Sequence, residues 1–415
     1  MSSTLVAGLD IGTSKTAVVI ADVVADATHG MQLKVLGVGQ ARTGGIRGEV
    51  VTDIEATTES VRKAINEAEL MAGVRVEKLY TGIAGEHIHG KASTGVVAIS
   101  GDEVMPRDVE RVHEVAQAVA LPAEREKLHA LPQEYIVDAQ AGIRDPVGMA
   151  GTRLEAEVYL VTAAAASAQN IRKAVTRAGY GVQELVLEPL AASMAVVSED
   201  EKEIGAALVE LGGGTTDVIV FHERKIRHLG SLPWGGSTVT KDIVAGLSLP
   251  YADAARIKER WGVARADLVD PNELFEAAGT APGSTRQIPR ELLAHIIEQR
   301  LDEIFELVNA QLKRAGLADS VGAGVVLTGG GASMPGVVEL AERSFTSPVR
   351  VGVPGEMLGG LVESVRRPKF ATATGLALFG ARRVALEAFD GAPAGSGSPV
   401  NDMIKWMRDW LTDFF

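Results

Sequence analysis

The chain has 415 residues, 46% of them hydrophobic, which is enough for two lobes and a substantial core. With 41 lysine and arginine residues against 54 aspartate and glutamate residues, its net charge of −13 argues against DNA or RNA as a bulk partner. The absence of cysteine excludes disulfides and thiolate metal sites and fits a reducing compartment.

No secretory or membrane-crossing segment is predicted. The first ten residues contain no basic stretch and end at Asp10, unlike a signal peptide. The longest apolar run, around residues 158–168, is too short and too rich in alanine to span a bilayer. Any membrane contact is therefore expected to lie along the bilayer surface.

The first part of the chain reads as a meander of strands beside one helix. Strands are predicted over residues 5–11, 17–22, 33–40 and 78–83, and a helix over residues 54–71. Residues 87–159 change the pattern, because short strands rich in turn residues surround a single helix predicted at 106–118. Helix and strand signals alternate again over residues 167–221.

The second half is richer in helix. Residues 238–316 include a long helix predicted at 290–314, and residues 279–288 are predicted to be a polar loop. The last predicted elements are a strand at 325–327 and a helix at 370–386.

The final segment, residues 401–415, is strongly amphipathic and follows a Gly/Ser/Pro-rich stretch that is predicted to be a flexible linker (389–400). Wound as a helix at about 100° per residue, it places all its large apolar side chains on one arc. These are Met403, Ile404, Trp406, Met407, Trp410, Leu411, Phe414 and Phe415. Tryptophan favours the water–lipid boundary, so the segment is consistent with a membrane-binding helix, and equally with a helix docked on the chain itself or on a partner.

One internal repeat stands out. Residues 8–16 (GLDIGTSKT) and 208–217 (LVELGGGTTD) both contain an apolar strand, an acid, an apolar residue, glycine and a small polar turn. Their acids, Asp10 and Glu210, are 200 positions apart. The repeat predicts two related lobes, each presenting a hairpin turn to a shared cleft.

Such turns suit a phosphate ligand, because glycine lets successive backbone N–H groups point at an anion. The candidate phosphate-binding residues are Gly12, Thr13, Ser14 and Lys15 in the first turn, and Gly212, Gly213, Gly214, Thr215 and Thr216 in the second. Asp10 and Glu210 can both face phosphate only with a cation between them, which implies Mg²⁺ held largely through water. Taken singly, each glycine run is more often an ordinary hairpin turn.

A third glycine run, residues 327–336, is predicted to open a helix at Pro335 and to let a base or ribose approach the backbone. Its candidate contacts are Gly329, Gly330, Gly331 and Ser333.

Together the three runs resemble the ATPase core of the actin, heat-shock chaperone and sugar kinase superfamily, and so imply ATP and Mg²⁺ as cofactors. Residues 187–193 (LEPLAAS) and 370–377 (FATATGLA) are similar to the segments that join its lobes. The resemblance implies that Glu188 orients the attacking water, although an acid in the first turn of a helix is also favoured by the helix dipole alone. It also implies that Gly236, in the turn at 235–242, and Lys258 contact the nucleotide.

Two positions depart from the superfamily pattern. The second turn normally begins with Asp, and Glu210 is one methylene longer. The adenosine helix often carries Glu three residues before its lysine, where this chain has Ala255. Both departures predict weak or slow hydrolysis with binding retained, so enzymatic activity is left open beyond at most a slow ATPase.

Residues 131–138 (LPQEYIVD), 142–149 (GIRDPVGM), 152–158 (TRLEAEV) and 84–88 (AGEHI) resemble the cell-division actin homologue family FtsA. The resemblance implies an α/β fold, a two-lobed actin-like ATPase with a nucleotide cleft between the lobes, plus a C-terminal amphipathic helix on a flexible linker. The implied subdomains are 1A (1–86, completed by 165–198 and 368–388), 1C (87–164), 2A (199–237, completed by 320–367) and 2B (238–319).

The same resemblance implies a protein that polymerises on the cytoplasmic face of the cell membrane at the division septum. Its implied partners are further copies of itself, the FtsZ tail through 2B, later division proteins through 1C, and lipid through the terminal helix. Three other functions stay open: a cytoplasmic pilus-assembly adaptor, a sugar kinase and, less favoured, a chaperone. No cluster of sugar-binding polar residues stands out, and no substrate-binding domain follows the ATPase core.

Overall fold

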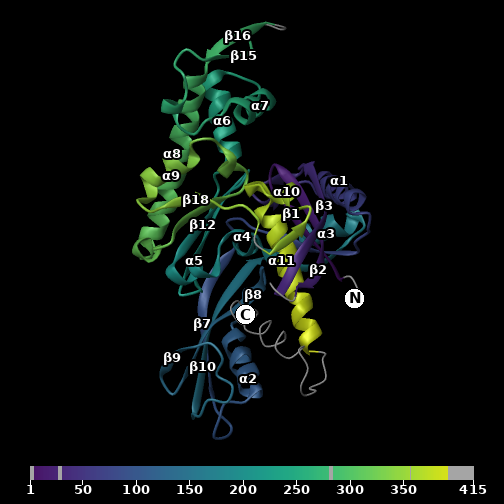
Figure 1. Ribbon diagram of the computed structural model, residues 1–415, viewed down its shortest axis with the longest axis vertical. Coiled ribbons are helices and arrows are strands. Elements are labelled where there is room, and N and C mark those ends of the chain that lie inside the picture. Colours follow the sequence, from purple (N-terminus) through teal and green to yellow (C-terminus); the bar gives the residue numbers. More distant parts are fainter. Residues whose placement is uncertain (1–3, 27–29, 280–283, 356, 391–415) are drawn as a thin grey trace.

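The computed structural model describes residues 4–26, 30–279, 284–355 and 357–390 (Figure 1). The terminal helix predicted at 401–415, with all its candidate membrane-binding residues, lies outside the described residues, as does the linker from residue 391.

The first lobe is built on a six-stranded sheet with the order β11-β6-β1-β2-β3-β19. These strands are β1 (Thr4–Ile11), β2 (Lys15–Asp26), β3 (Gly30–Arg42), β6 (Lys78–Ile83), β11 (Gly181–Leu187) and β19 (Leu358–Gly360). Strands β1 to β3 are antiparallel, whereas β6 and β11 run parallel to β1 and to each other. The meander predicted from the first forty residues is therefore confirmed.

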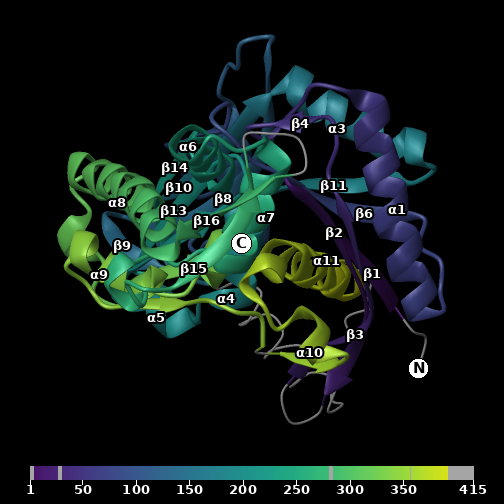
Figure 2. The same ribbon diagram turned by 90° about the horizontal axis from the view of Figure 1, so that it is seen from above.

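Helices cover both faces of this sheet (Figure 2). Alternation along β2 directs Val18 and Ile20 to α1 (Ile54–Ala72) and α3 (Ala165–Ala178). Ala17 and Val19 face the opposite side, into the core shared with α11 (Ala371–Asp390). Because both faces are covered, β2 is apolar from Ala17 to Ala25 except at Asp22 and shows no simple polar alternation.

The second lobe repeats the arrangement of the first with the order β14-β13-β12-β17-β18. Its strands are β12 (Ala206–Leu211), β13 (Thr216–His222), β14 (Lys225–Leu232), β17 (Gly324–Thr328) and β18 (Val349–Val351). The turn after β1 is closed by the Gly12 N–H donating to the Lys15 carbonyl at 3.1 Å. The turn after β12 is closed by Gly212 N–H to the Thr215 carbonyl at 3.0 Å. The internal repeat predicted from the sequence is therefore confirmed.

An insert follows β6 and forms the bottom of the molecule in Figure 1. It contains one sheet, β7-β10-β8-β9, formed by β7 (His89–Ala98), β8 (Arg125–Val137), β9 (Gln140–Ile143) and β10 (Arg153–Ala164). Helix α2 (Pro106–Gln117) packs against this sheet through Val112, which is buried with Leu154 and Ala156 in a small separate core.

A helical region at the top of Figure 1 continues from β14. It contains α6 (Gly236–Leu247), α7 (Tyr251–Trp261), α8 (Arg290–Arg314) and a hairpin of β15 (Leu274–Ala278) and β16 (Thr285–Pro289). The prediction of a loop at residues 279–288 is therefore wrong for residues 285–288, which belong to β16. Ile288 and its neighbour across the hairpin, Phe275, are buried against the helices, and this long-range packing selects the strand.

The third glycine run also differs from the prediction. Residues Gly330–Ser333 form a 3-10 turn, and α9 begins at Val337 (Val337–Phe345), two residues after Pro335. Gly336, with φ of 80°, separates the turn from the helix because its backbone is left-handed.

The chain passes from the first sheet to the second through α4 (Glu188–Val196) and α5 (Glu199–Ile204). It returns to the first sheet between β18 and β19, and α10 (Val362–Val365) and α11 follow. All nine residues of α4 are buried. Helix α11 approaches it so closely that a Cβ on Gly375 would lie 1.8 Å from the Ala191 carbonyl oxygen. None of the helices in the described part of the chain has the length and apolar content needed to cross a bilayer.

Gly375→Ala should therefore force α4 and α11 apart. Overpacking of this kind costs about 1–3 kcal/mol, so we expect a clear fall in melting temperature by differential scanning calorimetry. Gly101→Ala is the matched control, because a Cβ there meets no atom within 4 Å. Equal melting temperatures for the two variants would contradict the close helix crossing.

Candidate functional site

The two phosphate-type turns meet at the boundary between the lobes. A Cβ on Gly213 would lie 1.9 Å from the Ser14 hydroxyl oxygen, and one on Gly214 would lie 2.3 Å from the Thr13 hydroxyl oxygen. No side chain larger than hydrogen fits at either position. The structure thus brings the first and second turns together, with the glycine backbone of the second turn next to the hydroxyls of the first.

The start of α6 is docked on the second turn. Gly236 N–H donates to the Gly212 carbonyl at 2.9 Å, and Ser237 N–H donates to the Gly213 carbonyl at 2.7 Å. Lys258, on α7, donates from Nζ to the Gly236 carbonyl at 2.6 Å. Burial lowers the pKa of the Lys258 ammonium because the charged group has lost hydration. A ligand that accepts a hydrogen bond from this ammonium would replace that hydration. Gly236 and Lys258 therefore belong to the same site as the second turn.

The third glycine run reaches the same place from β17. Gly329 has φ of 80°, and a Cβ on it would lie 2.7 Å from the Leu211 carbonyl oxygen. A Cβ on Gly331 would lie 2.8 Å from the Leu211 Cβ, whereas Gly330 faces open space and Ser333 is exposed. Leu211 directly precedes the second turn, so all three runs converge at the end of β12.

The predicted acids lie in the same region on different elements. Asp10, at the end of β1, forms an ion pair with Lys15 at 3.0 Å. Glu210, at the end of β12, accepts a hydrogen bond from the Thr372 hydroxyl on α11. Glu188 is the first residue of α4 and lies against Gly82, where a Cβ would come 2.6 Å from its Oε1.

Burial dominates the electrostatics of these acids. It raises the pKa of Glu210 to about 8, an effect that the hydrogen bond from Thr372 opposes and the charge of Asp10 reinforces. Burial also raises the pKa of Glu188 well above its ordinary value, and the neighbouring charges of Asp10 and Glu49 raise it further. The site therefore holds more negative charge than it compensates, which favours a bound cation.

A magnesium ion fits this site through water only. In the part of the chain that the structure describes, no three Asp, Glu or His side chains are placed to hold a metal ion together. The Glu210 Oε2 atom is buried and accepts no hydrogen bond from a described residue. A buried carboxylate oxygen of this kind can accept a hydrogen bond from water bound to a divalent cation. The neighbouring glycine N–H groups suit the phosphate oxygens that such a cation accompanies.

Two acids that the sequence did not single out as site residues also belong here. Glu49, between β4 (Ile46–Arg47) and β5 (Val50–Val51), accepts from the Thr13 hydroxyl at 2.8 Å and from the Thr13 N–H at 3.3 Å. Burial raises its pKa to about 8. Asp217 lies directly across the hairpin from Glu210 and accepts from the Thr215 hydroxyl at 2.6 Å.

The position of Asp217 could have been found, because hairpin pairing from the second turn places it opposite Glu210. For Glu49 no local sequence pattern gave a signal. It is 36 residues from Thr13 along the chain, and only the folded path of β4 and β5 brings it there.

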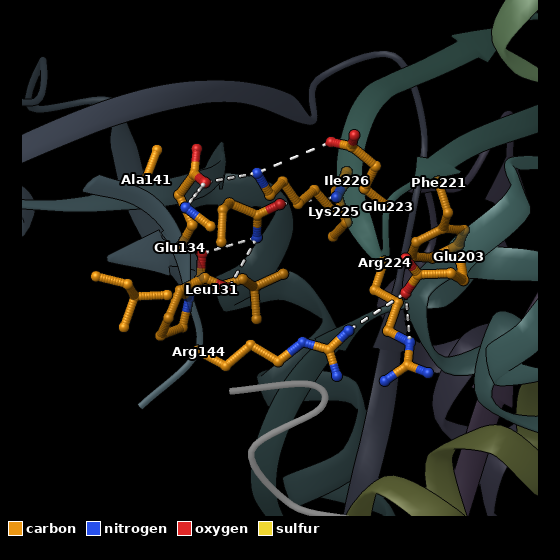
Figure 3. A pocket seen from close by; sticks show the side chains of 14 residues that line it. Leu131, Glu134, Ala141, Arg144, Glu203, Phe221, Glu223, Arg224, Lys225 and Ile226 are labelled. Carbon is orange, nitrogen blue, oxygen red and sulfur yellow. Dashed lines mark hydrogen bonds and ion pairs between the residues drawn. The ribbon is translucent and has the colours of Figure 1, made fainter. Parts of the chain in front are cut away.

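A cavity of about 390 Å³ lies elsewhere, between the insert and the second lobe (Figure 3). Arg144 from the insert and Arg224 from the β13–β14 turn both reach the Glu203 carboxylate, at 3.3 and 3.0 Å. Lys225 pairs with Glu134 of the insert at 2.8 Å. These ion pairs fasten the insert to the second lobe.

The strand order shared by the two sheets and the paired glycine turns define an actin-like ATPase fold. Similar solved structures include the PilM–PilN type IV pilus biogenesis complex, with a TM-score of 0.63, 17% identity and coverage of 91% of this chain and 98% of that one. MreB5 of Spiroplasma citri bound to ADP has a TM-score of 0.55, 12% identity and coverage of 94% and 99%. The MamK double helical filament has a TM-score of 0.51, 13% identity and coverage of 91% and 98%. At these identities the likeness shows the fold alone.

Sequence relatives are more specific. Family models match "Cell division protein FtsA" over residues 207–375 and "SHS2 domain inserted in FTSA" over residues 85–162. Cell division protein FtsA of Pseudomonas aeruginosa is 42% identical, covering 100% of this chain and 99% of that protein. The Escherichia coli K12 FtsA is 37% identical, with 97% of each covered. The chain belongs to the FtsA family.

The raised pKa of Glu210 predicts a pH-dependent cost of folding without nucleotide. The carboxyl titrates near 8 in the folded state and at its ordinary 4.5 in the unfolded state, so the cost grows as pH rises from about 4.5 to 8 and then levels off. Glu210→Gln removes this titration. We expect it to melt several degrees above the parent at pH 8, with the difference shrinking towards pH 5.

Thermal melting of both proteins across pH 5–8 makes this measurement, with Glu86→Gln as the control because Glu86 is exposed. A difference between Glu210→Gln and the parent that does not change with pH would contradict the assignment.

Proposed function

We propose that this member of the FtsA family binds ATP, polymerises on the inner face of the cytoplasmic membrane, anchors the FtsZ ring there and helps to recruit later division proteins. The observation that carries the nucleotide part is the face-to-face contact of the two glycine turns, Gly213 with Ser14 and Gly214 with Thr13. Two lobes that present N–H and hydroxyl donors to one place are suited to hold a polyphosphate between them.

In this proposal the first and second turns bind the phosphates, with Lys15 adding a positive charge. Gly236, Lys258 and the third glycine run contact the adenosine. Asp10 and Glu210 hold Mg²⁺ through its water shell, and the metal, when bound, supplies neutralisation of the phosphate charge.

In this proposal Glu188 orients the attacking water molecule. It lies at the first position of α4, where the chain leaves the first lobe, and burial raises its pKa well above its ordinary value, which makes its carboxylate a stronger proton acceptor. The longer side chain of Glu210 and the absence of an acid at Ala255 support slow hydrolysis. We therefore propose that nucleotide binding, more than turnover, controls assembly.

The partners are assigned by region. Subdomain 2B, residues 238–319, receives the FtsZ tail, and the insert 1C, residues 87–164, contacts later division proteins. Subdomains 1A and 2A, built on the two large sheets, form the filament core together with the neighbouring copy. The support is family membership and the resemblance to polymerising actin-like proteins, of which MamK is titled a filament.

Membrane attachment is assigned to residues 401–415. Lys405 and Arg408 are outnumbered by Asp402, Asp409 and Asp413, so attraction to anionic lipid contributes little. Insertion of the apolar arc then drives binding, and a single helix binds weakly. A filament presents many helices at once, which makes each later insertion effectively intramolecular. On this proposal ATP controls attachment through polymer length.

A pilus-assembly adaptor is the alternative that the PilM–PilN likeness raises, but that likeness rests on 17% identity against 42% to the Pseudomonas aeruginosa FtsA. A sugar kinase would transfer phosphate to common sugars at a robust rate. A phosphoryl-transfer screen with common sugars distinguishes a sugar kinase, and robust turnover in it would overturn the proposed cell-division function.

Lys258→Ala should weaken ATP binding about tenfold, since it removes a buried charge-assisted contact. Isothermal titration calorimetry with Mg-ATP measures this. Lys241→Ala on the neighbouring α6 is the control, because Lys241 is exposed. Unchanged affinity in a Lys258→Ala protein that melts like the parent would remove this residue from the site.

Truncation after residue 400 should abolish flotation with liposomes in the presence of ATP. Trp410→Glu, on the apolar arc, should do the same, whereas Thr412→Glu adds the same charge to the polar arc and should float normally. Flotation of the parent should rise with ATP and with protein concentration. Binding that persists without the tail would exclude it as the anchor, and electron microscopy on a lipid monolayer would show whether filaments form.

A further inference from the structure

Glu49 occupies the backbone donor that a phosphate needs in the first turn. Its Oε1 accepts from both the N–H and the hydroxyl of Thr13, at 3.3 and 2.8 Å. The Glu49 N–H donates in return to the Thr13 hydroxyl oxygen at 3.4 Å. Two contacts therefore hold the carboxylate on the turn, the Glu49 backbone adds a third, and the residue is buried.

The surroundings show that this seat lies between the two turns. Gly48, the preceding residue, places its Cα 3.1 Å from the position of a Cβ on Gly214 in the second turn. Gly85 closes the other side, where a Cβ would lie 3.2 Å from the Glu49 Cβ. The Glu49 carboxylate therefore holds the Thr13 donors at the place where the first and second turns meet.

The backbone at Glu49 is also unfavourable for a side chain. Its φ is 61°, in the left-handed region where glycine is preferred. Asp10 and Asp217 add like charge around its carboxylate. Neither backbone conformation nor local charge therefore favours a glutamate at this position, and the hydrogen bonds that Glu49 makes with described residues are those with Thr13.

We propose that Glu49 is a built-in competitor of the nucleotide phosphate. Its carboxylate holds the Thr13 N–H and hydroxyl in the absence of ligand, and ATP binds only by displacing it. Glu49 thereby sets a weaker nucleotide affinity than the turns alone would give. This inference rests on the proposed function, because it assumes that the turns bind phosphate.

The test is calorimetric titration of the full chain with Mg-ATP, Mg-ADP and adenosine. Glu49→Gly removes the competing carboxylate and relieves the left-handed backbone, so ATP and ADP should bind about tenfold more tightly. Glu49→Gln keeps a side-chain oxygen that can accept from Thr13 and removes the ionisable group, so it should give a smaller gain. Adenosine has no phosphate, so its affinity should stay unchanged in both variants.

Glu86→Gln is the control for net charge, since Glu86 is exposed and lies outside both turns. Binding by the parent without tightening in Glu49→Gly would overturn this inference alone, as would equal tightening for adenosine and ATP. No ATP binding by any variant at millimolar concentration would overturn the proposed function as well. Thermal melting of each variant confirms that the compared proteins are folded.

Discussion

The whole arrangement depends on one steric constraint, the approach of two glycine turns to within contact distance across the boundary of the lobes. At Gly213 and Gly214 even a methyl group would collide with Ser14 and Thr13. Each turn is fixed by its own hairpin and each hairpin by the sheet behind it, so the registers of β1–β2 and β12–β13 jointly set the width of the site.

Buried negative charge is the second constraint, and it destabilises the folded protein when no ligand is bound. Asp10, Glu49, Glu188 and Asp217 are all buried near the turns, and the Glu210 carboxylate points into the same region. Lys15 is paired with only one of these acids. A site with this imbalance is costly to keep fully ionised, and a cation accompanying a ligand offsets that cost. The same burial that raises the pKa values thus supports the proposal of a ligand that brings its own positive charge.

Much of the fold and of the candidate site could be predicted from the sequence, because each of the two turns is determined by a few neighbouring residues. The turns at 12–15 and 212–215 are set by glycines and small polar residues that act over a few positions, and the strands and α8 follow from apolar periodicity. Predictions failed where distant packing decides. Residues 285–288 form a strand because Ile288 packs with Phe275 against the helices, and polar, glycine-rich composition nearby concealed this. Glu49 could not be predicted because only tertiary structure brings it to Thr13.

The ion pairs around Glu203 give the insert an attachment that its place in the chain does not suggest. By sequence the insert branches from the first lobe, yet Arg144 and Glu134 bind it to the second. Gln133 adds to this attachment by accepting from the Ile226 N–H at 2.7 Å. A relative rotation of the lobes must therefore either break these contacts or drag the far end of the insert along. Because the insert extends away from the turns, a small rotation between the lobes would produce a larger displacement at its far end.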